Sequence, residues 1–190
     1  PILKEVICQN WNLTEGCREG TFDIPAWSLG DFFLDTLKPG EVTFVTGLNG
    51  SGMTSVTLNT ALAFAMQRSG AVVIHSVDQH PKNLAARLLN SAFGIPLSNP
   101  TEVGSTGACL PASAERLLRL DISIDGRLYE SLEAIRACYE AMETPGLIVV
   151  NDMAHFPFGV TKHETAAFLK AMAQGLESPV LVACKASIGI

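Results

Sequence analysis

Apolar runs and helical patterns alternate along the chain. Five short runs consist mostly of β-branched, aromatic and other apolar residues, and each of them predicts a buried β-strand. These runs cover residues 41–46, 71–76, 120–124, 147–150 and 179–184.

The segments between these runs have apolar residues at helical spacing. They predict helices over residues 54–68, 82–93, 129–142 and 164–176, with a further short helix at 112–118. Residues 97–111 are rich in Ser, Asn, Pro, Thr and Gly, which predicts a long surface loop. Strands that alternate with helices predict an α/β fold, a three-layer sandwich in which helices cover both faces of a mostly parallel sheet.

Length and composition favour a single domain overall. The chain has 190 residues, of which 47% are hydrophobic and 17% are charged, and this suits one compact core. Residues 1–35 mix aromatic and polar positions, and they predict an irregular N-terminal lead-in packed on the core. Residues 36–190 then contain the whole α/β pattern.

The charge balance of the chain is acidic. Its 13 Lys and Arg residues against 19 Asp and Glu residues give a formal net charge of −6. We therefore expect no broad positive surface for a phosphate backbone, and any DNA contact should be indirect or weak. No apolar run reaches the roughly 18 residues of a membrane span and no basic-apolar leader opens the chain, so we expect no membrane contact.

The cysteines and histidines indicate neither disulfides nor a zinc site. The cysteines are far apart, form no C-x-x-C pair and leave one over if bridged, which favours a reducing, cytoplasmic location. The histidines show no H-E-x-x-H or paired-ligand spacing, so we expect no zinc. These residues are Cys8, Cys17, Cys109, Cys138, Cys184, His75, His80, His155 and His163.

A glycine-rich segment follows the first predicted strand and precedes the first predicted helix. It reads Gly47-Leu48-Asn49-Gly50-Ser51-Gly52-Met53-Thr54, which fits the phosphate-loop spacing G-x-x-x-x-G-K-[ST] except that Met53 stands at the lysine position. In this context backbone amides and the positive end of the helix dipole point at an anion. The candidate nucleotide-binding residues are Gly47, Asn49, Gly50, Ser51, Gly52, Met53, Thr54 and Ser55.

Met53 cannot supply the charge that a lysine gives to the terminal phosphates. A charge-assisted hydrogen bond is worth about 1.5–3 kcal/mol, which corresponds to about one to two decades in affinity. The loop amides and the Thr54 hydroxyl, which can hold Mg²⁺, are unaffected, so we expect weak binding of ATP and Mg²⁺. Hydrolysis should suffer more, because the lysine stabilises charge that develops in the transition state. The alternative is a glycine-rich turn without a ligand.

Several further features accompany the loop in a defined order. A P-A-W-S-L-G-D-F-F-L-D-T-L-K-P-G-E stretch from Pro25 precedes it, and Ser76-Val77-Asp78-Gln79, Leu84-x-x-Arg87-Leu88-Leu89, Leu147-Ile148-Val149-Val150 and Ser178-Pro179-Val180 follow. Over residues 25–190 this order resembles the RecA-like motor domain of DnaB-type replicative hexameric helicases, with a degenerate P-loop. The resemblance implies a mostly parallel RecA-like P-loop NTPase sheet.

The same resemblance implies roles for four side chains outside the loop. Asp78 matches a catalytic glutamate that orients the attacking water, but it is one methylene shorter. Asn151 matches a metal-associated aspartate, and its neighbour Asp152 can replace that group only where the strand ends or twists. Lys185 matches a polar sensor on a strand that the family places beside the loop strand, so its ammonium can partly compensate for Met53. The alternative is a lysine that extends into solvent.

Three functions remain open from these residues. The first is a degenerate DnaB-helicase-related protein that binds nucleotide weakly or not at all and acts mainly through protein contacts in DNA replication, recombination or repair. Its expected partners are further copies of the chain or a replication or recombination protein. The second is an active ATP-dependent DNA helicase-type motor, and the third is a binding module unrelated to DNA, since a fold does not determine a function.

Overall fold

The computed structural model describes residues 2–3, 5–6, 33–68, 70–76, 78–93, 117–129, 131–142, 145–153 and 160–186. Within these ranges strands and helices alternate along the chain. The strands are β1 (Val42–Gly47), β2 (Val72–His75), β3 (Ile122–Asp125), β4 (Leu147–Val150) and β5 (Val180–Lys185). The helices include α3 (Met53–Gln67), α4 (Pro81–Phe93), α7 (Leu132–Glu140) and α8 (Lys162–Leu176).

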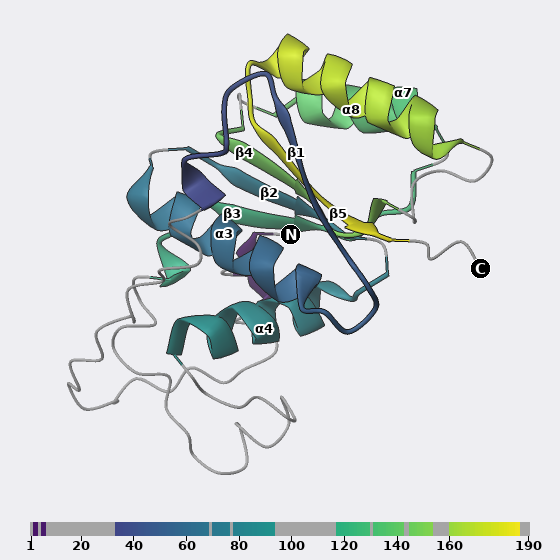
Figure 1. Cartoon of the computed structure of the whole chain (residues 1–190). Helices are drawn as coiled ribbons and strands as arrows, with labels where there is room; N and C mark the ends of the chain where they lie inside the picture. Colours follow the sequence, from purple (N-terminus) through teal and green to yellow (C-terminus); the bar gives the residue numbers. More distant parts are fainter. Residues whose placement is uncertain are drawn as a thin grey trace, which may run out of the picture.

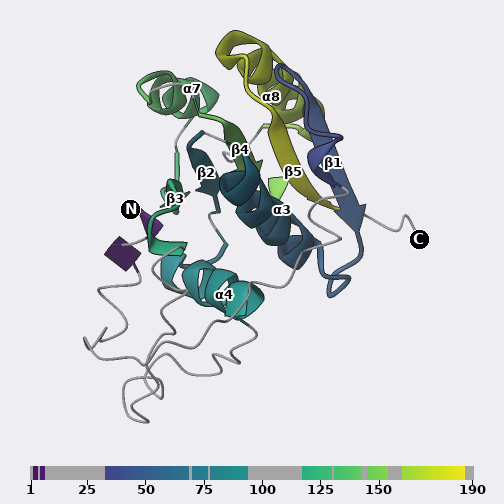
Figure 2. The same ribbon diagram turned by 90° about the vertical axis from the view of Figure 1, so that its left-hand side faces the viewer.

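The five strands form one sheet in the order β1-β5-β4-β2-β3, and all neighbouring pairs are parallel. Helices α3 and α4 cover one face of this sheet, and α7 and α8 cover the other (Figures 1 and 2). The arrangement confirms the predicted α/β sandwich with a parallel sheet between two helical layers.

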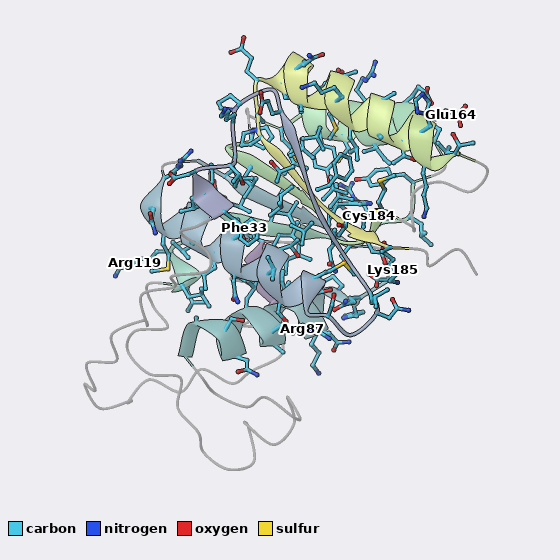
Figure 3. All side chains as sticks on the ribbon, in the orientation of Figure 1. Phe33, Arg87, Arg119, Glu164, Cys184 and Lys185 are labelled. Atoms are coloured by element: carbon cyan, nitrogen blue, oxygen red, sulfur yellow. The ribbon has the colours of Figure 1, made fainter. Side chains whose placement is uncertain are left out.

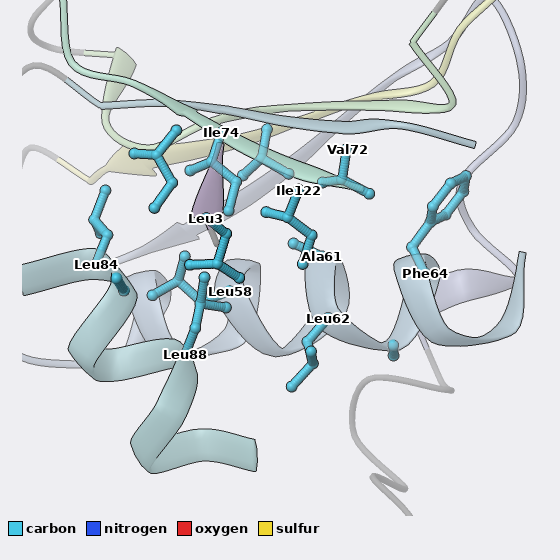
Figure 4. Packing of buried hydrophobic residues seen from close by; sticks show 14 of the residues in the cluster. Leu3, Leu58, Ala61, Leu62, Phe64, Val72, Ile74, Leu84, Leu88 and Ile122 are labelled. Atoms are coloured by element: carbon cyan, nitrogen blue, oxygen red, sulfur yellow. The ribbon is translucent and has the colours of Figure 1, made fainter. Parts of the chain in front are cut away.

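Strands β2 and β4 are buried at every residue, whereas β1 lies at the edge of the sheet and has no buried residue, so the predicted burial of this first strand is wrong. Successive side chains of a strand point to opposite faces of the sheet. In β2, Val72 and Ile74 belong to the core beneath α3 and α4, whereas Val73 belongs to the core beneath α7 and α8. Figure 4 shows the first of these cores, in which Leu58 of α3 and Leu84 of α4 face the sheet. Because both faces of the sheet are covered, β2 and β4 are apolar at almost every position, whereas β3 alternates apolar with polar residues.

Local hydrogen bonds correct two of the predicted helix starts. Helix α8 begins at Lys162, two residues before the predicted start, because Thr161 and Glu164 form a capping box. Helix α7 begins only after Ser131, whose side chain accepts a hydrogen bond from the Ala134 amide at 3.2 Å. Tyr129, predicted as the first helical residue, instead lies in the connection that precedes α7.

Some predictions fall outside the described residues. These are most of the lead-in at residues 1–35, the loop at 97–111, most of the short helix at 112–118, and Cys8, Cys17, Cys109 and His155. At the ends of these segments, Leu3, Leu34 and Leu117 are buried in the core that contains α3 and α4. Within the described part of the chain, none of the helices has the length and apolar character needed to cross a membrane.

Candidate phosphate-binding cleft

The loop between β1 and α3 depends on glycine for its backbone conformation. Gly50 and Gly52 have φ angles of 81° and 88°, in the left-handed region that favours glycine. A Cβ atom at either position would meet nothing within 4 Å, so glycine is needed there for its conformation and not for lack of space. Gly52 caps α3 without a side-chain hydrogen bond. The first amides of the helix therefore have no capping side chain and can donate to a ligand.

Met53 folds back across this loop. A Cβ atom placed on Gly47 would lie 3.2 Å from the Met53 Cγ atom and 3.4 Å from its sulfur. The thioether side chain therefore packs beside the backbone of Gly47, where the loop begins. An apolar group lies within the loop at the position where the phosphate-loop spacing calls for an ammonium group.

The loop forms one wall of a cleft of about 400 Å³ at the carboxyl ends of the strands. Most of the predicted site residues line it, including Asp78 and Lys185, and Arg87, Gln79 and Ala183 line it in addition. The full lining is Asn49, Gly50, Gly52, Met53, Thr54, Ser55, Asp78, Gln79, Arg87, Asn151, Asp152, Ala183 and Lys185. Gly47 and Ser51 belong to the same loop without lining the cleft. The topology thus gathers side chains from five segments, as expected for a parallel sheet.

Strand register places Lys185 beside the loop. β5 pairs with β1 in parallel, with Lys185 opposite Gly47, and the Ala186 amide donates to the Gly47 carbonyl at 2.9 Å. The Lys185 ammonium lies 2.6 Å from Asp152 Oδ2. The hydrogen bond to Asp152 raises the pKa of Lys185 above its usual range. Lys185 thus lines the cleft, but its charge is directed at a carboxylate of the protein.

Asp152 is turned into the cleft by its backbone. β4 ends at Val150, the Asn151 amide still donates to the His75 carbonyl at 2.8 Å, and Asp152 then has a φ of 83°. A non-glycine residue in this region is uncommon and is often found at functional sites. Because the strand has ended, consecutive side chains need not face opposite ways, and Asn151 and Asp152 both line the cleft.

A short hydrogen-bond chain connects Asn151 to Asp78. The Asn151 Nδ2 atom donates to Ser76 Oγ at 3.2 Å, and Ser76 Oγ donates to Asp78 Oδ1 at 3.0 Å. Ser76 is fully buried and Asn151 is 2% exposed, so both positions are defined by packing. The remaining Asn151 oxygen is buried and accepts no hydrogen bond within the described part of the chain. The geometry leaves an acceptor available beside the cleft.

Arg87 is one of three lining residues, with Gln79 and Ala183, that the sequence did not predict as site residues. It lies on α4, its side chain is exposed, and Figure 3 shows it on the same side of the molecule as Lys185. Its neighbours Leu84 and Leu88 are buried against α3 and the sheet, which orients this face of α4. The sequence feature that could have identified Arg87 is a single cation among the leucines of the helix that follows Asp78.

Comparison with known proteins supports the fold. No family model matches the chain, and no curated protein matches it. Among solved structures 219 chains match, one of which is described as a DnaB-like replicative helicase and its interactions with primase. That match has a TM-score of 0.63 and 15% sequence identity over 96% of this chain and 47% of the other.

The chain therefore spans about half the length of that solved structure. At 15% identity the likeness establishes the fold alone. Together with the five-stranded parallel sheet and its helical layers, it shows that the chain is an α/β domain whose fold is similar to that of the DnaB-like replicative helicase.

Proposed function

We propose that the chain is a DnaB-helicase-related RecA-like domain that binds nucleotide weakly and acts mainly through protein contacts in DNA replication, recombination or repair. The observation that supports this most directly concerns Met53 and Lys185, which occupy the two positions beside the loop from which a cation could contact the phosphates. Met53 provides no charge, and the Lys185 ammonium is bound to Asp152 at 2.6 Å. The loop can then attract phosphates chiefly with its amides and the helix dipole.

The charges in the cleft support weak affinity. Asp78 and Asp152 are carboxylates, and Lys185 and Arg87 are cations, so the four formal charges of the lining cancel. A nucleoside triphosphate brings several negative charges to this neutral site. Loss of one charge-assisted contact costs about one to two decades in affinity.

Hydrolysis would be weakened further than binding. Asp78 is exposed and accepts a hydrogen bond from Ser76, but it is one methylene shorter than the glutamate that the resemblance implies. The charge missing at Met53 is one that stabilises the transition state of phosphoryl transfer. Asp78 would thus orient water inefficiently, next to phosphates that the loop stabilises poorly.

The lining residues fit a magnesium ion bound with the phosphates. The buried Asn151 oxygen accepts no hydrogen bond within the described residues, and the Thr54 hydroxyl group stands on the first turn of α3. Oxygen atoms of these types are the ligands that Mg²⁺ prefers. The ion, when bound, would neutralise phosphate charge, while Asp152 stays engaged by Lys185.

A second candidate function is an active ATP-dependent helicase-type motor. One observation favours it, namely that Asp78, Asn151, Asp152 and Lys185 all line one cleft with the loop. In this alternative Asp78 orients the attacking water. The Lys185 ammonium moves away from Asp152 and contacts the phosphates.

The proposed partners are other proteins. The chain has a formal net charge of −6, which disfavours a broad contact with a phosphate backbone. We therefore expect a second copy of the chain or a replication or recombination protein as the partner, with DNA contact indirect or weak.

Calorimetric titration of ATP with Mg²⁺ into the purified chain tests the proposal. We expect a dissociation constant well above 1 µM, because the loop lacks one charge-assisted contact. A submicromolar constant, together with steady phosphate release, would overturn weak binding and favour the motor.

A further inference from the structure

Two cations line the cleft, and their surroundings differ. The Lys185 ammonium is 2.6 Å from the carboxylate of Asp152, which is only 7% exposed. The two charges of this ion pair compensate each other in the absence of a ligand. Moving Lys185 to a phosphate would break this short ion pair with a buried carboxylate, which is unfavourable.

Arg87 has no comparable partner. No ion pair within 4.0 Å joins it to a carboxylate within the described part of the chain. It projects from α4 into the lining of the cleft, which it shares with the loop residues Asn49 to Ser55. A guanidinium group presents two parallel N–H donors that match two phosphate oxygens, so its geometry suits this ligand better than an ammonium does.

A second observation also points to a ligand in this cleft. Asn151 is 2% exposed, and its side-chain oxygen has no hydrogen-bond donor within the described residues. A buried acceptor without a donor is costly, and a bound cation or ordered water would satisfy it. The cleft thus has a free anion-binding group in Arg87 and a free acceptor in Asn151, which suits a phosphate chain with its counter-cation.

We propose that Arg87, and not Lys185, is the cation that contacts the ligand, and that the ligand class is a polyphosphate chain. This inference rests on the proposed function, because both require the loop to receive phosphate. Arg87 shares the lining with the glycine-rich loop, whose amides and helix dipole suit phosphate groups.

Calorimetry with two probes tests this inference, namely inorganic tripolyphosphate with Mg²⁺ and ATP with Mg²⁺. Arg87→Ala should raise the dissociation constant of both probes by about tenfold to a hundredfold. Arg87→Lys should recover part of that loss, since it keeps the charge without the paired donors. Lys82→Ala is the matched control, because Lys82 is on the same helix and does not line the cleft. It should change binding by less than about twofold, since solvent screens distant charges.

Equal affinity of the wild type and Arg87→Ala would overturn the role of Arg87, and so would equal losses in Arg87→Ala and Lys82→Ala. A loss confined to ATP would overturn the polyphosphate class. Tight wild-type binding would contradict only the proposed weak affinity, and the Arg87 comparison would still decide this inference. If the wild type shows no binding, the same comparison is made in the Met53→Lys background, and absence of binding there as well overturns the inference. Thermal midpoints show that each variant is folded.

Discussion

Two buried aspartates at the carboxyl ends of the strands each form an ion pair, but their surroundings differ. Asp125 ends β3 and is 6% exposed, while Asp152 follows β4 and is 7% exposed. Asp125 accepts bonds from Arg127 Nε and Nη2, each at 2.9 Å, and also from the Tyr129 hydroxyl group. Asp152 forms its ion pair, at 2.6 Å, with Lys185 at the end of the neighbouring strand β5.

The donors around Asp125 make a closed structural cluster. Burial alone would raise the pKa of Asp125, but hydrogen bonds from Arg127 and Tyr129 outweigh it and lower the pKa to about 2. Arg127 also donates to the Cys138 sulfur at 2.8 Å, and the Tyr129 hydroxyl oxygen lies 3.1 Å from the same sulfur, which joins α7 to the cluster. His75 also interacts with Asp125, but burial of the His75 side chain has the larger effect and lowers its pKa.

The cleft around Asp152 is open by comparison. Its cations come from α4 and β5, far apart in sequence, and its lining keeps an acceptor on Asn151 without a donor. The comparison teaches that a buried carboxylate with a cation is not in itself a sign of function. What sets the surroundings of Asp152 apart is that they line a cleft of about 400 Å³ beside the loop between β1 and α3.

The largest expected effect is on the Asp125 cluster, through Asp125→Asn. The carboxylate has a folded pKa of about 2 against an unfolded value of 3.8, so it stabilises the fold above pH 3.8. This contribution is lost as the pH falls from about 4 towards 2 and amounts to about 2 kcal/mol. Asp125→Asn should therefore lower the free energy of unfolding by about 2 kcal/mol at neutral pH, with a smaller difference in acid.

Denaturant unfolding of both proteins from pH 7 to pH 2 measures this difference. Asp121→Asn is the control, because Asp121 is exposed just before β3 and should change stability by less than about 0.5 kcal/mol. A constant gap between wild type and Asp125→Asn across the whole pH range would contradict the stabilising role of the ionised carboxylate.

A smaller effect is expected for the pair beside the cleft, through Lys185→Met. The substitution leaves the Asp152 carboxylate buried without its cation, although the Lys185 side chain is itself 42% exposed. We expect a loss of about 1 kcal/mol in the free energy of unfolding, between the values for surface and buried pairs. Lys185→Met with Asp152→Asn should recover most of it, since no buried charge then remains.

Thermal and denaturant unfolding of the two single variants and the double variant gives the coupling energy. Additive effects of the two substitutions would show that Lys185 and Asp152 do not interact in solution, and the inference that Lys185 is withheld from the ligand would then lose its basis.

The sequence predicted the fold well because its signals are local. Apolar runs correspond to β1–β5 within one or two residues at each end, and the glycine spacing located the loop between β1 and α3. The capping pair Thr161 and Glu164 was also visible in the sequence, and it would have placed the start of α8 at Lys162.

The site was less predictable because its contacts are not local. Whether Asp152 enters the cleft depends on a backbone turn with φ of 83°, which no residue pattern specifies. The Lys185 contact depends on strand register, and Arg87 enters the cleft through the packing of α4. Tyr129 was assigned to a helix because its bond to Asp125, which holds it in the preceding connection, has no signature in spacing.

Paired calorimetric titration of the wild type and Met53→Lys with ATP and Mg²⁺ tests the central claim most directly. The account predicts that Met53→Lys lowers the dissociation constant by about tenfold to a hundredfold, because it restores one charge-assisted contact in a loop whose backbone already suits phosphate. Met53→Leu, which keeps an apolar side chain, should bind like the wild type. Equal constants for wild type and Met53→Lys would contradict the claim that the loop receives phosphate and lacks only the charge.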